Sequence, residues 1–202
     1  YCDLPEKVLS LFKAMEKLSN TAQAQTKIDE PFLSQLYDQL LESDLFSIYR
    51  SAFEKVTGHT VALIHSTIEK TPESEMARCK NNYCATLLKR ESCSERCVQH
   101  SEDLSVRSTK RAATAECEGK IATSLIPVHC QGSVIAYLRT GQVKMSKEEL
   151  TNNVLAKLEE NLPESVAEDL KASFDALPAY DEKDYVNQLV VIGAFSMQLS
   201  EI

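Results

Sequence analysis

The chain has 202 residues, of which 43% are hydrophobic and 26% are charged, and its formal net charge is −8. This length and apolar content are typical of one sizeable folded domain or two small ones, and they exclude a disordered chain. No apolar run approaches the roughly 20 residues of a membrane span, so we expect none. The acidic excess argues against direct nucleic-acid binding, which relies on Lys and Arg.

The first third of the chain has helical periodicity. Residues 3–18 carry a capping box followed by apolar residues at helical spacing, which predicts a helix within an N-terminal helical segment, residues 1–34. A second helix is predicted from Pro31, and a third over residues 43–58. Residues 60–65 then form a short β-branched run, which predicts a strand.

The middle of the chain predicts a helical region followed by a β-hairpin. Residues 73–114 show mainly helical signals. Residues 121–130 and 133–143 are rich in β-branched residues and flank a turn that contains Gly132, so we expect two antiparallel strands.

The last third, residues 146–202, is predicted to be helical. A capping box at residues 146–149 predicts a helix start there, and a final helix is expected from residue 181. That helix is apolar on nearly all sides around residues 189–195, which predicts packing between elements or in a homodimer. Its end lacks a stop signal, so we expect an output domain beyond it. The whole pattern predicts an α+β fold: a small antiparallel sheet with flanking N- and C-terminal helices.

Charge and cysteine content single out the middle of the chain. Residues 79–146 carry 10 basic and 6 acidic groups, whereas residues 1–78 and 147–202 are both acidic. Six of the seven cysteines lie in this electropositive third. An odd number of cysteines and no secretory signal favour a reducing cytoplasm with free or metal-bound thiols.

The cysteines suggest a metal site or a thiol sensor. Cys93, Cys97 and His100 have helical spacing and share one face, where thiolates and an imidazole suit zinc. A fourth ligand could come from Cys84 or Cys117, and four thiols also match the ligand count of an iron–sulfur cluster. No Cys-x-x-Cys pair is present, so two other readings stay open: small buried hydrophobic residues, and redox-active or ligand-contacting thiols.

A small sheet covered by helices can enclose an apolar cavity with a few polar groups. Arg139 lies in an otherwise apolar strand and could hold an anion. Alternation along strands places Ser124 with Ile126, and Tyr137 with Arg139. The candidate wall residues are Leu63, His65, Ser124, Ile126, Tyr137, Arg139 and Gln142.

Catalytic motifs are weak in this sequence. Cys130 follows His129 directly, but adjacent side chains of a strand point to opposite faces and could not share a proton. With five glycines, the sequence shows neither a phosphate-binding loop nor a nucleophile elbow. We therefore expect a non-enzymatic protein.

The order of motifs resembles the PocR-type sensory domain. The motifs that carry the resemblance, over roughly residues 35–145, are Asn82-Tyr83-Cys84, the pair Cys93 and Cys97, Cys117-Glu118-Gly119, Leu125-Ile126-Pro127-Val128, Gly132, and Gly141-Gln142-Val143.

The resemblance implies a PAS-related fold and a bacterial sensor of small organic molecules, such as diols or other short hydrocarbon derivatives. It also implies an output domain, for example a DNA-binding domain of a transcription regulator or a histidine kinase. It adds Cys84 to the expected ligand-binding residues, since this residue is part of the aromatic-Cys motif. A thiol-based metal or redox sensor, with Cys84, Cys93, Cys97 and Cys117 as receptor, is the alternative.

Overall fold

A computed structural model describes residues 30–67, 71–146, 148–159 and 162–201. The helix expected at residues 3–18 lies outside them, as does most of the segment 1–34. The described helices are α2 (Glu30–Glu42), α3 (Asp44–Thr57), α4 (Pro72–Arg78), α5 (Asn82–Leu88), α6 (Glu91–Arg107), α7 (Asn152–Leu158), α8 (Glu164–Asp175) and α9 (Glu182–Ser200). The described strands are β1 (Val61–His65), β2 (Ala113–Glu116), β3 (Ala122–Cys130), β4 (Ser133–Met145) and β5 (Ala179–Tyr180).

The strands form an antiparallel sheet in the order β1-β4-β3-β2, and the short β5 runs parallel to the end of β4. The predicted hairpin is confirmed: β3 and β4 are joined at Gln131 and Gly132, which both have positive φ, as a tight two-residue hairpin turn requires. The predicted α+β class with flanking helices is likewise confirmed.

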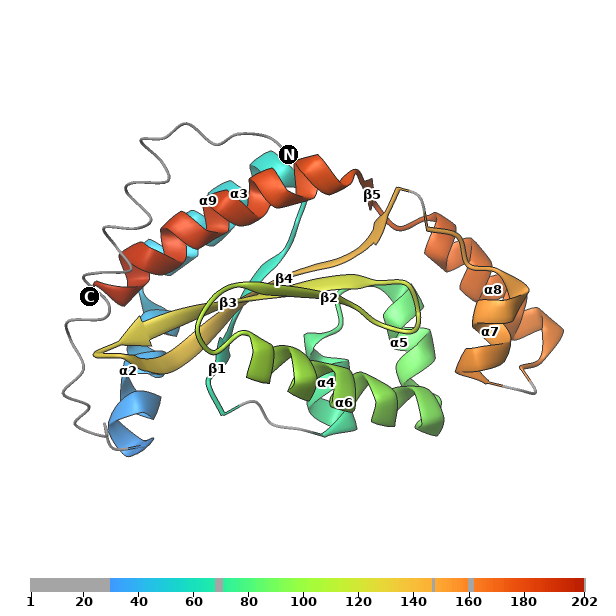
Figure 1. Cartoon of the computed structure of the whole chain (residues 1–202), viewed down its shortest axis with the longest axis horizontal. Helices are drawn as coiled ribbons and strands as arrows, with labels where there is room; N and C mark the ends of the chain where they lie inside the picture. Colours follow the sequence, from blue (N-terminus) through green and yellow to red (C-terminus); the bar gives the residue numbers. More distant parts are fainter. Residues whose placement is uncertain (1–29, 68–70, 147, 160–161, 202) are drawn as a thin grey trace.

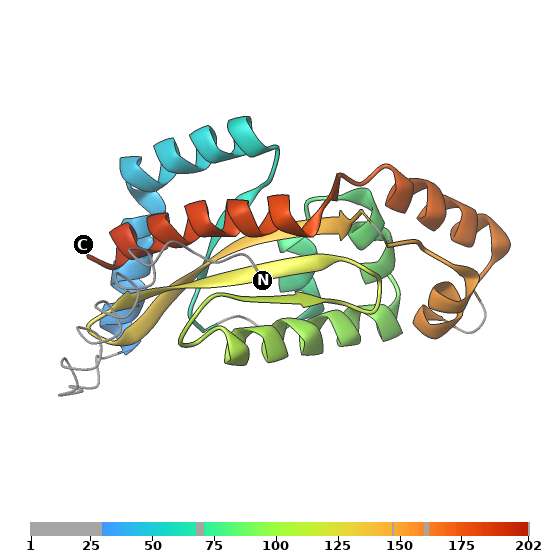
Figure 2. The same cartoon turned by 45° about the horizontal axis from the view of Figure 1, so that its top comes forward.

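Helices cover both faces of the sheet. Figures 1 and 2 show α3 and α9 side by side on one face and α4, α5 and α6 on the other, with α7 and α8 beyond one end. The face toward α2, α3 and α9 has a continuous apolar core, to which β3 and β4 contribute Ile126, Val128 and Leu138, and α9 contributes Ile192 and Phe195. We call this the α9 face, and the opposite one the α6 face.

A bulge in β4 breaks the alternation of its side chains. Thr123 pairs with Gly141 and Ala122 with Val143, so Gln142 is the extra residue of the strand. Gly141 has φ +104°, and a Cβ there would lie 2.6 Å from the Ala122 carbonyl oxygen and 2.7 Å from the Tyr185 hydroxyl on α9. Only glycine fits this position, and the bulge turns Gln142 toward the same face as Arg139.

Two sequence predictions were wrong in detail. Residues 73–114 were expected to be helical, but β2 begins at Ala113; alanine favours helices, and here pairing with β3 overrides that preference. A helix was expected from Ser146, whereas α7 begins at Asn152 with Thr151 as its N-cap. The Ser146 amide donates to the Tyr180 carbonyl and the Glu148 amide to the Met145 carbonyl, so the chain forms a turn there instead of starting a helix.

The helix predicted from residue 181 is α9, and one side of it is buried, whereas Val186, Val190 and Val191 are at least half exposed. No helix among the described residues has the length and apolar character needed to cross a membrane.

Candidate ligand-binding site

The α6 face encloses a cleft with two adjoining chambers. The inner chamber, about 40 Å³, lies between the sheet and α4, α5 and α6, and the outer one, about 270 Å³, opens beside the turn after β2. Both chambers are lined by Cys84, Leu88, Cys97, His100 and Cys117. Apolar side chains dominate the inner wall, namely Ile64, Leu104, Ile121 and Leu125.

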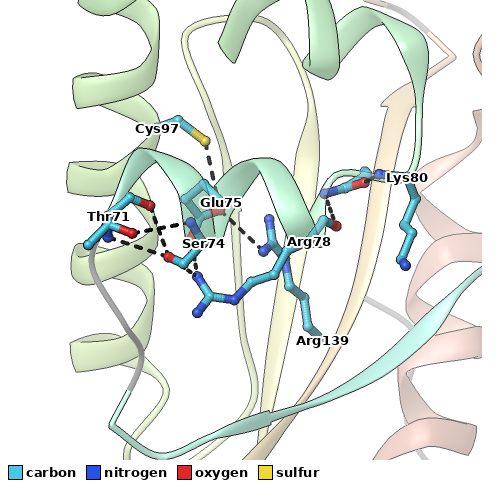
Figure 3. Close-up of polar contacts among 8 residues, drawn as sticks. Thr71, Ser74, Glu75, Arg78, Lys80, Cys97 and Arg139 are labelled. Carbon is cyan, nitrogen blue, oxygen red and sulfur yellow. Dashed lines mark hydrogen bonds and ion pairs between the residues drawn. The ribbon is translucent and has the colours of Figure 1, made fainter. Parts of the chain in front are cut away.

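A buried carboxylate lies at the wall of the inner chamber. Glu75 on α4 is 2% exposed, and Arg139 of β4 donates to its Oε2 at 3.2 Å. Arg78, one turn along α4, donates to Oε1 at 2.9 Å, and the Cys97 thiol lies 3.9 Å from Oε2 (Figure 3). Two guanidinium groups therefore offset the desolvation of one carboxylate, and this pairing fixes Arg139 at the cavity.

The local sequence explains why α4 begins where it does. The Thr71 side chain accepts from the Ser74 amide, the Ser74 side chain accepts from the Thr71 amide, and Pro72 occupies the first turn. This capping box orients a helix of only seven residues, so Glu75 points toward the sheet.

His100 on α6 has a buried ring nitrogen without a partner. Its Nε2 makes no hydrogen bond within the described part of the chain, and the residue lines both chambers. Burial lowers its pKa, and the nearby Arg107 and Arg139 act in the same direction, so the ring is neutral at pH 7. A neutral imidazole donates one hydrogen bond and accepts another, and the share of Nε2 is unused in a residue that lines both chambers.

Gln142 closes the cavity at the turn between α4 and α5. Its Oε1 accepts from the Lys80 amide at 2.9 Å, and its Nε2 donates to the Arg78 carbonyl at 3.3 Å. Asn81 donates to the backbone carbonyl of Gln142 at 3.5 Å and caps α5 by accepting from the Cys84 amide. The β4 bulge therefore holds the end of α4 and the start of α5.

The outer chamber brings together all four cysteines of the predicted metal site: Cys84 from α5, Cys93 and Cys97 from α6, and Cys117 from the turn after β2. Burial raises the pKa of the Cys97 thiol to about 12. Burial also raises the pKa of Cys117, although backbone amides of its turn partly oppose this by donating to the sulfur. These two thiols are protonated at pH 7.

The described residues contain no group of three or more His, Cys, Asp or Glu side chains placed to hold a metal ion. The metal assignment to Cys84, Cys93, Cys97 and Cys117 therefore stays a prediction. No disulfide links the six cysteines that the structure describes.

Cys79 differs from the other thiols. It lies at the end of α4, and its sulfur contacts the Asn81 carbonyl oxygen at 3.2 Å. A hydrogen bond from the Cys84 thiol lowers the pKa of Cys79 to about 6, and the same contact raises the pKa of Cys84. Cys79 therefore ionises more readily than the thiols around it, and sequence spacing gave no sign of this.

The structure divides the predicted wall residues between the two faces. Cys84, Arg139 and Gln142 line the cleft. Tyr137 lies on the same face but packs with Leu104, and its hydroxyl donates to the Ser105 carbonyl.

The remaining wall residues lie on the α9 face, which corrects the expectation of one common wall. His65 contacts Ser34 and Tyr37 of α2, Ser124 hydrogen bonds to Tyr185 of α9, and Ile126 and Leu63 belong to the apolar core. The reason is the register: Leu125, not Ser124 or Ile126, pairs with Arg139. A shift by one residue moves every side chain of a strand to the other face.

Sequence reasoning missed Glu75, Thr123 and Leu125 as cavity residues, although all three line the inner chamber. Thr123 and Leu125 could have been found by pairing β3 correctly with Arg139. Glu75 carried no signal, because an acidic residue in the first turn of a short helix is usually exposed.

Comparison with known proteins identifies the chain's relatives. Residues 39–202 match a family model described as the sensory domain found in PocR. This match covers the cleft and also α7, α8 and α9. No curated protein and no solved structure matches the chain. The chain belongs to the family of the PocR sensory domain.

Proposed function

We propose that this domain binds a small organic molecule in the cleft between α6 and the sheet. The observation that carries the proposal is the buried, unpartnered Nε2 of His100, a residue that lines both chambers, beside a Glu75–Arg139 ion pair whose charges are already matched. A buried polar atom without a hydrogen bond costs roughly 1–3 kcal/mol, and a ligand hydroxyl or carbonyl would supply the missing partner.

The dimensions and lining of the cleft support a short, largely apolar ligand with one or two polar groups. At about 270 Å³, the outer chamber is smaller than the roughly 300–1,000 Å³ of pockets for drug-sized molecules. Leucines and isoleucines suit a hydrocarbon part, and His100 suits a hydroxyl. Diols and related short hydrocarbon derivatives, which the family resemblance implies, have this chemistry.

The binding test is thermal melting of the protein with a panel of short diols, short carboxylates and small aromatic compounds. A compound present at 100 times its Kd should add about 2.7 kcal/mol of stability, and a shift of several degrees is then expected for at least one class. If no compound of the panel shifts the melting temperature, the proposal fails.

The variant His100→Phe separates binding from folding. Phenylalanine keeps the ring and removes the unpartnered nitrogen, so we expect the free protein to be at least as stable as the wild type. The ligand-induced shift in melting temperature should be lost. His129→Phe is a suitable control, because His129 lines neither chamber and the same substitution there should leave the shift intact.

We further propose that ligand binding shifts the population of two packings of α9, and so signals to an output domain of a bacterial transcription regulator or signalling protein in the cytoplasm. The support is that α9 packs on β3, whose other face borders the cleft. Hydrogen-deuterium exchange with and without ligand tests this, since protection should change in α9 as well as in α6.

Elemental analysis distinguishes this function from the metal-sensor alternative. Because the described thiols and carboxylates are not grouped to hold an ion, we expect well below one zinc or iron per chain in protein purified without added metal. About one metal per chain would instead support the thiol-based sensor.

A further inference from the structure

We infer that the outer surface of α3 and α9 is the contact between two copies of this chain, with their α9 helices antiparallel. One side of α9 packs on the sheet through Tyr185, Ile192, Phe195 and Leu199. The opposite side is also apolar and faces solvent. It presents Val186, Val190, Ala194 and Met197, spaced three or four residues apart.

The neighbouring helix widens this apolar surface. α3 lies beside α9, where Tyr49 stacks on Phe195 with ring centroids 3.4 Å apart and donates to the Val191 carbonyl. The solvent side of α3 carries Leu45, Ile48 and Val56, and Val56 is 84% exposed. Apolar side chains therefore face solvent on both of two adjacent helices, and such exposed apolar surfaces mark interaction sites.

Charged residues at the two ends of the exposed apolar side of α9 favour a second copy of this chain as the binding partner. Lys183 and Glu201 lie on the same side of the helix as Val190. Neither forms an ion pair with another described residue. A two-fold axis at the level of Val190 and Ala194 would place Lys183 against the partner's Glu201, and Glu201 against the partner's Lys183.

The antiparallel orientation also agrees with the helix dipoles. Lys183 lies in the first turn of α9, where a positive charge is unfavourable. Pairing with the partner's Glu201 across an antiparallel contact offsets this penalty. A parallel contact would instead bring Lys183 close to the partner's Lys183. A two-fold contact of this kind is self-complementary and closes at two copies.

Sedimentation equilibrium of the full chain with a matched pair of variants tests the contact. Val190→Glu places a charge at its centre, and Val106→Glu places one on α6, where valine is 69% exposed compared with 64% at Val190. We expect a dimer for the wild type and for Val106→Glu. Val190→Glu should raise the dimer Kd at least about 30-fold, with an unchanged circular-dichroism spectrum.

Charge reversal tests the orientation. Lys183→Glu and Glu201→Lys should each raise the dimer Kd about three- to tenfold at low salt, and the double variant should restore it. In a parallel dimer the double variant would not restore affinity, and that result would overturn the antiparallel arrangement.

A monomeric wild type, or a dimer insensitive to Val190→Glu, would overturn the contact itself. If Val190→Glu lowers the melting temperature of a monomer, the patch is covered by another part of the same chain. That outcome also contradicts the inference. None of these results depends on whether a ligand binds in the cleft.

Discussion

The two faces of the sheet are built from the same strands and differ in how they are filled. The α9 face is a continuous apolar core, in which Val128, Ala136, Leu138 and Ile192 are fully buried. The α6 face carries a cavity, a buried ion pair and several thiols. One side of the sheet is thus a tightly packed apolar core, and the other keeps polar groups and unfilled space.

The largest expected effect comes from the buried charge on the α6 face. Glu75→Leu removes the carboxylate that pairs with Arg139, whose side chain is 12% exposed, and should cost about 3–5 kcal/mol because a buried charge loses its partner. Urea unfolding measures this loss of the free energy of unfolding. The double variant with Arg139→Leu should recover much of it. The control is disruption of the more accessible pair Lys120 and Glu116. If Glu75→Leu lowers the free energy of unfolding no more than this control does, the buried ion pair does not contribute to stability as expected.

The same substitution on the two faces compares their packing directly. Leu138 on the α9 face and Leu104 beside the cavity are 0% and 1% exposed. Leu138→Ala should cost about 3–5 kcal/mol and Leu104→Ala about 2–3 kcal/mol, because Leu104 already borders empty space and loses fewer contacts. If both variants lose the same free energy of unfolding in urea, the inference that the two faces differ in packing is contradicted.

The β4 bulge should tolerate no side chain at Gly141. Gly141→Ala combines an unfavourable φ with a contact of 2.6 Å to the Ala122 carbonyl oxygen and should cost about 2 kcal/mol or more. Gly132→Ala is the control: its φ is also positive, but a Cβ there meets nothing within 4 Å. A similar loss for both variants would mean that only backbone conformation matters at Gly141.

The smallest effect concerns thiol reactivity and leaves the fold intact. Because the hydrogen bond from Cys84 lowers the pKa of Cys79 to about 6, the alkylation rate of Cys79 should rise between pH 5 and 7 and then level off. Cys97, with a pKa of about 12, should stay unreactive over this range. Mass spectrometry after timed iodoacetamide treatment measures both sites. Removing the hydrogen bond with Cys84→Ala should move the Cys79 transition to higher pH.

The fold could be predicted from local patterns, and the site only in part. Alternation and turn residues were sufficient for the β3-β4 hairpin, and caps at Ser43 and Gly58 for α3. The cysteines of α6 share the cavity with His100 because helical spacing fixes a common face.

Local sequence patterns do not determine which residues of two strands pair with each other. Both Ser124 and Leu125 lie in a strand that is buried on both sides, so alternation could not tell which one shares a face with Arg139. The ion pair of Glu75 and Arg139 joins residues 64 apart in sequence, and no local signal marks such a contact.

The bulge at Gly141 and Gln142 has a further consequence for how the two faces act on each other. Gln142 hydrogen bonds to the turn between α4 and α5. Gly141 has no side chain, and the Tyr185 hydroxyl of α9 lies in the space that a Cβ would need. Two consecutive residues of one strand thus touch the wall of the cavity on one side and the terminal helix on the other. If the turn between α4 and α5 moves when the cavity fills, the bulge is the part of β4 through which that movement would reach α9.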